Sequence, residues 1–351
     1  MKISWIVNNI NQLGGIEQVV CGLSNFFSKE LGHELKIISI NSSESHVFFP
    51  LDSSVEILHC GLDWHTQTFS KLCKLIGRTL RTLDADILIT CHSTISYAVI
   101  LNKRKFHGKV VVTQHSAVDS FSKKRHLCNA LLFRFADKFI VLTENDRRAF
   151  ARLHCASEVI PNASFIQNDY RSSLEQKVIV SAGRLEEIKG FDRLIDAFAA
   201  VSSKFPEWKL CICGSGSVED SLRKQISAHG LTDRVLLPGA VKNIDEYMRN
   251  ASIFALSSHS EGFSLVLVEA MSHGLPTVSF DLPAVREICE GTAILFAQQG
   301  NISDFSQKLD TLMSSDSLRI SLGQSAYEIS KKYSIPSISN RWMSLFEELI
   351  N

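Results

Sequence analysis

Short apolar runs recur along the whole chain, and each is followed by glycine or polar residues and then by a helix-like pattern. The runs cover residues 1–7, 35–40, 86–90, 109–113 and 139–142 in the first half, and 177–182, 209–213, 235–237, 253–256 and 277–280 in the second. Apolar strands that alternate with helices are typical of parallel sheets with both faces covered. The pattern therefore predicts an α/β fold, with ligand sites beyond the carboxyl ends of the strands.

The chain has room for two such sheets. Its 351 residues are enough for two α/β domains of ~150 to 180 residues, each with its own core. The polar run 162–176 is the most linker-like segment between the two halves. We therefore predict one doubly wound, Rossmann-like domain in residues 1–165 and a second in residues 166–335. A last segment, 336–351, contains an amphipathic helix.

Composition favours an intracellular protein without a disulfide framework. The nine cysteines, an odd number, lie mostly in apolar contexts, and we interpret Cys211 and Cys213 as core residues because no zinc-like pair accompanies them. The apolar run 3–7 is too short for a signal peptide, and no segment reaches the ~18 apolar residues of a membrane span. We expect a cytoplasmic protein, either free or attached to the inner face of the plasma membrane.

Charge is unevenly spread, although the formal net charge is zero. Residues 1–167 carry 19 Lys and Arg against 14 Asp and Glu, so this part has +5 and the remainder −5. The basic residues gather on one face of a predicted helix and in two tripeptides: Lys71, Lys74, Arg78, Arg81, 103–105 and 123–125. Such clusters suit an anionic membrane surface, and a random imbalance between solvated surfaces explains them equally well. Because they lack interleaved aromatic residues, they argue against nucleic acid.

The stretch 257–278 contains an acid inside an apolar helical pattern. A helix of about ten residues that begins near Ser264 and ends at Gly274 is apolar nearly all round, so Glu269 lies in or beside a core. A buried carboxylate needs a partner, and ligand hydroxyls would serve. Glu261 precedes the helix, where backbone N–H groups favour an anion. This spacing suits a diphosphate and a ribose, but an Arg partner for Glu269 and a solvated loop position for Glu261 explain it equally well.

Two cations stand at the end of the first apolar run of the second half. Arg184 follows this run directly, and Lys189 precedes the next predicted helix. Two positive charges at the mouth of a strand-loop-helix unit can neutralise a departing diphosphate. Surface ion pairs with Glu186 or Glu187 are the competing explanation.

Glycines and histidines stand at strand ends in the first half. Gly14 and Gly15 allow close backbone approach to a phosphate or a sugar, but the fingerprint G-x-G-x-x-G is absent, which argues against NAD or FAD. His92 and His115 follow two predicted strands. A single histidine is usually structural, whereas two at equivalent carboxyl ends favour a site.

A D-x-D sequence, Asp84-Ala85-Asp86, has the spacing of a known metal-binding motif. These acids precede their strand and so lie at the sheet edge opposite the expected ligand site. We interpret them as turn residues and expect no metal.

The string EGFSLVLVEAMSHGLPTV places Glu261 and Glu269 in an E-x7-E motif and resembles the retaining glycosyltransferases of family 4, which have the GT-B fold. The string GRLEEIKGFDRLIDAF, with Arg184 and Lys189, is similar to the phosphate-binding block of that family. In the first half GGIE at 14–17 and I-P-N at 160–162 resemble its first loop and its domain crossing. Residues 163–165 depart from the family, which has glycine and aspartate there.

The resemblance implies two Rossmann-like domains that face a central cleft, with the segment 336–351 returning to the N-terminal domain. It implies that Arg184 and Lys189 hold the donor diphosphate, that Glu269 holds the ribose, and that Glu261 orients the donor sugar. His115 would take part in catalysis and face the donor sugar or the acceptor, and His92 would lie on the acceptor side. The other nucleotide-sugar contacts that it implies are Gly14, Gly15, Gly214, Val241, Gly262, Phe263 and Ser264.

The reaction that the resemblance implies is transfer, with retention, of a hexose or N-acetylhexosamine from a UDP-sugar. The acceptor would be a hydroxyl of a growing, lipid-linked bacterial surface glycan such as lipopolysaccharide or capsule, and no metal or other cofactor would be needed. A UDP-sugar 2-epimerase, or a non-catalytic partner protein with the same fold, are the alternatives. Sequence leaves the sugar, the acceptor, the linkage, the choice of UDP or GDP and the oligomeric state open.

Overall fold

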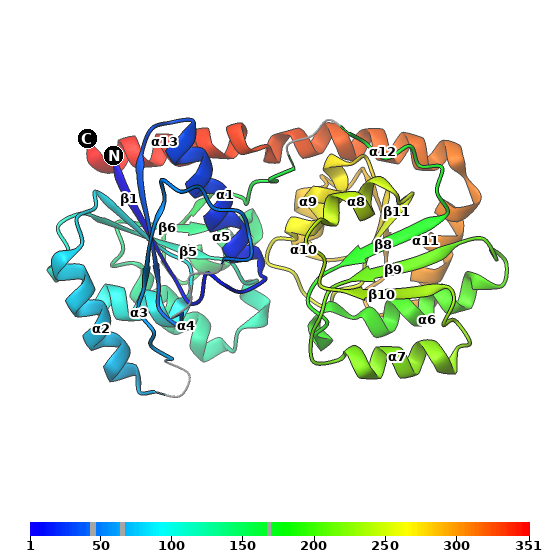
Figure 1. The fold of residues 1–351 in the computed structure, drawn as a ribbon, viewed down its shortest axis with the longest axis horizontal. Coiled ribbons are helices and arrows are strands. Elements are labelled where there is room, and N and C mark those ends of the chain that lie inside the picture. The colour runs from blue at the N-terminus through cyan, green and yellow to red at the C-terminus, as the bar shows by residue number, and fades with distance from the viewer. Residues whose placement is uncertain (43–46, 64–66, 167–169) are drawn as a thin grey trace. The chain divides into compact units, whose positions relative to one another are not determined.

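The computed structural model describes residues 1–42, 47–63, 67–166 and 170–351. The chain forms two compact units, and the second is inserted between two parts of the first (Figure 1). Unit 1 comprises Met1–Ala163 and Ile335–Asn351, and unit 2 comprises Ser164–Ser334. Residues 167–169 of the expected linker lie outside the described residues.

A parallel sheet of seven strands forms the centre of unit 1, in the order β3-β2-β1-β4-β5-β6-β7. The strands are β1 (Lys2–Val7), β2 (Glu34–Ser39), β3 (Glu56–His59), β4 (Ile87–Thr90), β5 (Lys109–Gln114), β6 (Lys138–Val141) and β7 (Glu158–Val159). The strand order reverses between β1 and β4. In a doubly wound sheet this is the topological switch point, where the loops on either side part and leave room for a ligand.

Helices cover both faces of this sheet. They are α1 (Gly15–Lys29), α2 (Phe69–Thr82), α3 (Ser93–Asn102), α4 (Lys123–Phe133), α5 (Glu144–Ala151) and α13 (Ile335–Ile350), with 3-10 turns η1 (Lys103–Lys105) and η2 (Val118–Ser120). The apolar sides of α2, α3 and α4 contribute to one buried cluster. The last helix, α13, packs beside α1 (Figure 1), where the ring centroids of Phe27 and Phe346 lie 5.7 Å apart.

Unit 2 is built on a parallel sheet of six strands in the order β10-β9-β8-β11-β12-β13. These are β8 (Val178–Ala182), β9 (Lys209–Cys213), β10 (Val235–Gly239), β11 (Ile253–Leu256), β12 (Thr277–Phe280) and β13 (Ile294–Ala297). Its switch point lies between β8 and β11. The repeated order in both units confirms the predicted doubly wound α/β architecture.

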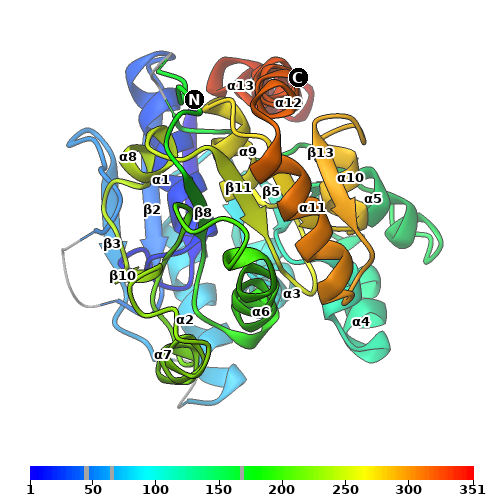
Figure 2. The ribbon, with the colours of Figure 1, turned by 90° about the vertical axis from the view of Figure 1, so that its right-hand side faces the viewer.

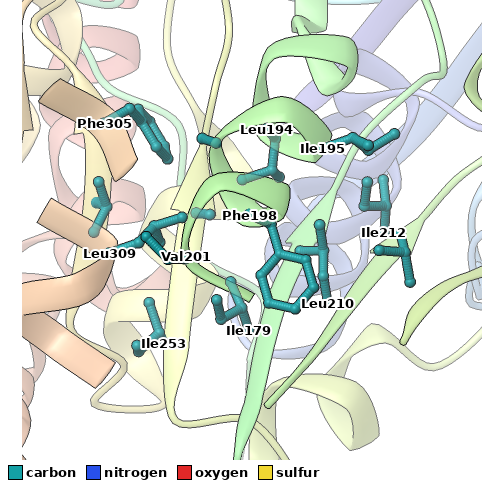
Figure 3. Close-up of a cluster of buried hydrophobic side chains, with 14 of the residues drawn as sticks. Ile179, Leu194, Ile195, Phe198, Val201, Leu210, Ile212, Ile253, Phe305 and Leu309 are labelled. Carbon is teal, nitrogen blue, oxygen red and sulfur yellow. The ribbon is translucent and has the colours of Figure 1, made fainter. Parts of the chain in front are cut away.

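The helices of unit 2 are α6 (Phe191–Ser202), α7 (Glu219–Ala228), α8 (Ile244–Arg249), α9 (Leu265–Ser272), α10 (Pro283–Ile288), α11 (Ile302–Ser314) and α12 (Asp316–Ser330), with 3-10 turns η3 (Glu187–Lys189) and η4 (Lys331–Tyr333). Helices α6 and α11 lie side by side (Figure 2). Their apolar residues, Phe198 and Leu309 among them, pack with Leu210 of the sheet to form the core (Figure 3). Cys211 and Cys213 are buried in β9, which confirms their interpretation as core residues.

Asp84 and Asp86 lie at the amino end of β4, away from the carboxyl ends of the strands. The Lys2 ammonium lies 2.5 Å from Asp84 Oδ2, and the Lys2 backbone N–H donates to Asp86 Oδ2 at 2.8 Å. The two acids therefore fasten the start of β1 to the start of β4, as expected for structural residues. Within the described ranges, no helix is both long and apolar enough to cross a bilayer.

Candidate functional site

The predicted donor-side residues of unit 2 come from neighbouring loops at the carboxyl edge of its sheet. Arg184 follows β8, Gly214 follows β9, Val241 follows β10 and Glu261 follows β11. Backbone hydrogen bonds join these loops, with Gly183 N–H donating to Cys213 O at 3.0 Å and Gly214 N–H to Gly239 O at 2.8 Å. The fold thus gathers these segments around the switch point.

Gly214 lets the loops after β8 and β9 touch backbone to backbone. Its φ is +153°, and a Cβ at this position would clash with the carbonyl oxygen of Gly183. The loop that carries Arg184 is therefore held by its neighbour. The Arg184 side chain is exposed and makes no ion pair with any described residue, so its guanidinium remains available for an anion.

Lys189 and Glu261 form the central ion pair of unit 2. Lys189 Nζ lies 2.8 Å from Glu261 Oε1, and the same oxygen accepts a hydrogen bond from Ser258 Oγ at 2.6 Å. The Glu261 side chain is 6% exposed and that of Lys189 is 23% exposed. Glu261 is therefore not a solvated loop acid. Lys189 does not pair with Glu186, whose carboxylate instead accepts from Ser217 Oγ at 3.0 Å.

The turn η3 is fixed against the end of β11, and this places Lys189 beside Glu261. Gly190 has φ +61°, and a Cβ there would clash with the Ser257 carbonyl oxygen. Ser257 Oγ donates to the Lys189 carbonyl at 3.0 Å, and His259 N–H donates to the Ile188 carbonyl at 2.8 Å. Only glycine reaches this left-handed conformation without strain while it allows so close an approach.

Helix α9 begins one residue after Ser264, which occupies the predicted N-cap position. The Ser264 hydroxyl makes no cap bond, and it is buried without a hydrogen-bond partner among the described residues. Glu269 is 4% exposed, which confirms its predicted burial. The helix is shorter than expected because it ends at Ser272, and Gly274 then turns the chain at φ +69°. Phe263, also predicted as a contact, is buried against the ring of Tyr333.

The glycine pair of unit 1 lies at the carboxyl end of β1, beside its switch point. Gly14 is the N-cap of α1, and a Cβ there would clash with the carboxylate of Glu17, which is buried. A Cβ at Gly15 would meet no described atom within 4 Å. Gly14 is thus needed for internal packing, whereas Gly15 leaves space above the strand.

His92 and His115 follow the adjacent strands β4 and β5, and they affect each other. Burial and, to a smaller extent, the charge of His92 together lower the pKa of His115 to about 3. His115 Nε2 lies 2.9 Å from Thr113 Oγ1, while Nδ1 is buried and has no hydrogen-bond partner among the described residues. The fold therefore brings the two predicted histidines to one edge of unit 1, together with Cys91, whose pKa burial raises to about 12.

Sequence reasoning did not identify Ser258 or Thr113. Ser258 shares Glu261 with Lys189, and Thr113 contacts His115. A signal for Thr113 existed, because residues two apart on a strand point to the same face. Ser258 had none beyond its position after an apolar run. Among the described residues, no group of three or more His, Cys, Asp or Glu is arranged to hold a metal ion.

Comparison with known proteins gives two family matches that together span most of the chain. Residues 13–163 match the family described as Glycosyltransferase Family 4, and residues 163–329 match Glycosyl transferases group 1. The amylovoran biosynthesis glycosyltransferase AmsD of Erwinia amylovora is 25% identical over 97% of this chain and 98% of its own length.

A second relative is an α-1,4-N-acetyl-D-galactosaminyltransferase of Campylobacter jejuni that is named for a GalNAc-containing diNAcBac-PP-undecaprenol. It is 23% identical over 100% of this chain and 99% of its own length. Among solved structures, HepE of Anabaena in complex with UDP and glucose superimposes with a TM-score of 0.81 at 20% identity, over 99% of this chain and 100% of HepE. The fold is GT-B, and the chain belongs to the glycosyltransferases of family 4.

Proposed function

We propose that this glycosyltransferase moves a hexose or N-acetylhexosamine from a UDP-sugar to a hydroxyl of a growing, lipid-linked bacterial surface glycan, with retention of anomeric configuration. The ion pair of Lys189 and Glu261 at the switch point of unit 2 is the observation that carries the proposal. A buried acid and a cation at the carboxyl edge of a parallel sheet suit a ligand that has both phosphates and hydroxyls.

The donor diphosphate would bind Arg184, Lys189 and the start of α9. Two cations and the free backbone N–H groups of a helix terminus stabilise the charge that develops on a departing diphosphate. The unpartnered Ser264 hydroxyl is a further donor at that terminus. These groups supply the charge stabilisation for which other transferases use a metal ion, so we infer that none is required.

Glu261 would orient the donor sugar through its second carboxylate oxygen. Lys189 and Ser258 both contact Oε1, and no described residue donates a hydrogen bond to Oε2. A carboxylate oxygen held in this way can accept from sugar hydroxyls. Glu269, buried in the first turns of α9, would accept from the ribose in the same manner.

The anomeric configuration is retained if the bond to the leaving diphosphate and the bond to the acceptor lie on the same face of the sugar. The bond from the anomeric carbon to the diphosphate oxygen breaks, and the bond to the acceptor oxygen forms on the face that the diphosphate leaves. The leaving phosphate takes the acceptor proton. This course suits a site in which Glu261 is held by Lys189 and Ser258 rather than directed as a nucleophile.

The relatives support the donor and the acceptor class. The HepE structure contains UDP and glucose, and the Campylobacter transferase is named for an undecaprenol-linked glycan. AmsD is named for amylovoran biosynthesis. We infer a UDP-sugar donor and a lipid-linked acceptor for this chain, and hence action at the cytoplasmic face of the membrane.

An amphipathic surface on unit 1 supports membrane docking. On α4 and just after it, Leu127, Leu131 and Phe135 recur every four residues and are 48%, 46% and 61% exposed. Four exposed basic residues lie beside this stripe: Lys123, Lys124, Arg125 and Arg134. Apolar side chains flanked by cations fit the headgroup region of an anionic bilayer. The basic residues of α2, namely Lys71, Lys74, Arg78 and Arg81, are also all exposed.

A screen of nucleotide release across UDP- and GDP-sugars tests the proposed function. We expect one UDP-sugar to be hydrolysed slowly by the protein alone and much faster with a lipid-linked acceptor, with the product in the anomeric configuration of the donor. Conversion of the donor to an isomer without acceptor would indicate the 2-epimerase instead. If no sugar nucleotide were turned over and none raised the melting temperature, the proposal would be wrong.

A further inference from the structure

The hydrogen bonds around Thr113 determine which ring nitrogen of His115 carries its proton. Thr113 Oγ1 donates its single hydrogen to the Thr90 carbonyl at 2.9 Å. The same oxygen lies 2.9 Å from His115 Nε2. Because the hydroxyl hydrogen is already used, the oxygen can only accept from the ring. Nε2 must therefore be the protonated nitrogen.

His115 Nδ1 is consequently an acceptor that needs a donor. It is buried and meets no hydrogen-bonding group of any described residue. A buried polar atom without a partner is rare in folded proteins and calls for an explanation. The ring stays neutral near pH 7, since burial and the nearby His92 lower its pKa to about 3. A phosphate oxygen, which also accepts, cannot satisfy Nδ1, whereas a sugar hydroxyl can.

We propose that Thr113 holds His115 as the Nε2–H tautomer, so that Nδ1 accepts a hydrogen bond from a sugar hydroxyl. Thr113 is then a positioning residue. His115 accepts a hydrogen bond from a sugar hydroxyl and does not bind the diphosphate. The identity of the ligand rests on the proposed function, while the tautomer itself does not.

Nitrogen-15 spectroscopy of histidine-labelled protein tests the tautomer directly. Two-bond correlations distinguish protonated from unprotonated ring nitrogens, and comparison with His115→Gln assigns the His115 signals. We expect Nε2 protonated and Nδ1 unprotonated, unchanged between about pH 5 and pH 8, the range in which an ordinary histidine titrates. The UDP-sugar should shift the Nδ1 resonance, whereas UDP alone should not. Finding the proton on Nδ1 in the wild type would overturn the proposal.

Three variants test the role of Thr113. In Thr113→Val the hydroxyl is lost, so we expect a mixed tautomer and a kcat/KM for the UDP-sugar that falls roughly tenfold, the effect of one hydrogen bond. UDP affinity, measured by calorimetry, should not change. Thr113→Ser keeps the hydroxyl and should restore both the tautomer and kcat/KM.

Ser96→Ala is the matched control, because Ser96 Oγ lies 2.6 Å from Thr90 Oγ1 and is buried in the same region without touching His115. It should leave the tautomer and kcat/KM at wild-type values. An unchanged kcat/KM and tautomer in Thr113→Val, or an equal loss in Ser96→Ala, would refute the positioning role. A protein that turns over no sugar nucleotide but shows the Nε2–H tautomer would refute the proposed function and leave the tautomer assignment standing.

Discussion

Glu261 and Lys189 illustrate how a site keeps charge in a largely buried place. A carboxylate that is 6% exposed is costly without a partner, and here a lysine ammonium and a serine hydroxyl both contact one of its oxygens. The lysine in turn stays partly exposed, so it can face a ligand phosphate as well. Lys189 and Glu261 thus compensate each other's charge, and under the proposed function each gains a further partner when the donor binds.

Replacing Lys189 with alanine should lower turnover by ~10²-fold or more, as loss of one charge-stabilising group typically does. The measurement is kcat with the donor found in the hydrolysis screen, together with the melting temperature, because Glu261 also loses a partner. Lys204→Ala is the matched control, since Lys204 pairs with Asp310 at 2.6 Å on the surface of the same unit. Wild-type turnover with unchanged donor affinity in Lys189→Ala would refute the assignment of Lys189.

The low pKa of His115 predicts how stability depends on pH. The unfolded chain binds this proton near pH 6.5, whereas the folded protein does so only near pH 3. Between these values the unfolded state binds more protons, so stability falls as pH falls, by about 1.4 kcal/mol per pH unit. The variant His115→Gln has no imidazole to titrate, so its stability lacks this fall with pH.

We therefore expect the wild type to lose stability relative to His115→Gln as pH falls from about 6.5 towards 4. Urea unfolding at several pH values measures the difference. Parallel profiles for the two proteins would mean that His115 is not buried as a neutral ring.

At the scale of the element, two helices that both carry leucines differ in how much of their surface is buried. Helix α9 is apolar nearly all round and is buried on nearly all sides, which is why an acid inside it is informative. Helix α4 also carries leucines, but Leu127 and Leu131 remain exposed because α3 and the sheet cover only its opposite side. Two features support the proposal that α4 docks on a membrane: the exposed apolar stripe and the cations beside it.

The double variant Leu127→Glu/Leu131→Glu should bind anionic vesicles at least tenfold more weakly than the wild type, because it replaces apolar side chains that would enter the bilayer with charges that anionic lipid repels. Sedimentation with phosphatidylglycerol vesicles at low and high salt measures this. An environment-sensitive dye on Cys128, the exposed cysteine of the chain, should shift to the blue on binding.

Ile320→Glu is the control, because Ile320 is an isolated apolar residue on unit 2 that is 60% exposed. It should bind vesicles as the wild type does. Equal binding by the double variant, or no dye shift on neutral and anionic vesicles alike, would exclude α4 as a docking surface.

At the scale of the molecule, the two units share one sheet plan but differ in charge. Unit 1 carries 20 Lys and Arg against 16 Asp and Glu, a net +4, which leaves 17 against 21, a net −4, for unit 2. In each unit the predicted residues lie at the carboxyl edge of the sheet, after the strands at the switch point or after the strands next to these on one side. The basic unit also holds the apolar stripe of α4, so the charge and the exposed leucines favour the same surface for an anionic bilayer.

Much of this organisation could be read from local pattern. Strands β9, β11 and β12 have the predicted bounds. In an α/β protein, a short apolar run that is followed by glycine or polar residues is most often a buried strand. The elements that were not predicted are α3, α4, α8, α11 and α12 among the helices and β3 and β13 among the strands. Helix α3 lacks a polar face that would reveal its period, and β3 is short and mostly half-exposed.

The sequence by itself determined the α/β class, the loops that carry Arg184, Lys189 and Glu261, and the burial of Glu269, because each depends on short-range periodicity or on a glycine nearby. Tertiary structure decided that Lys189 pairs with Glu261, 72 residues along the chain, rather than with Glu186. It also decided that Thr113 donates its hydrogen to Thr90 and that no residue in the described part of the chain donates to His115 Nδ1. The physical reason is that partners and exposure are set by which segments pack together, and no local pattern records that.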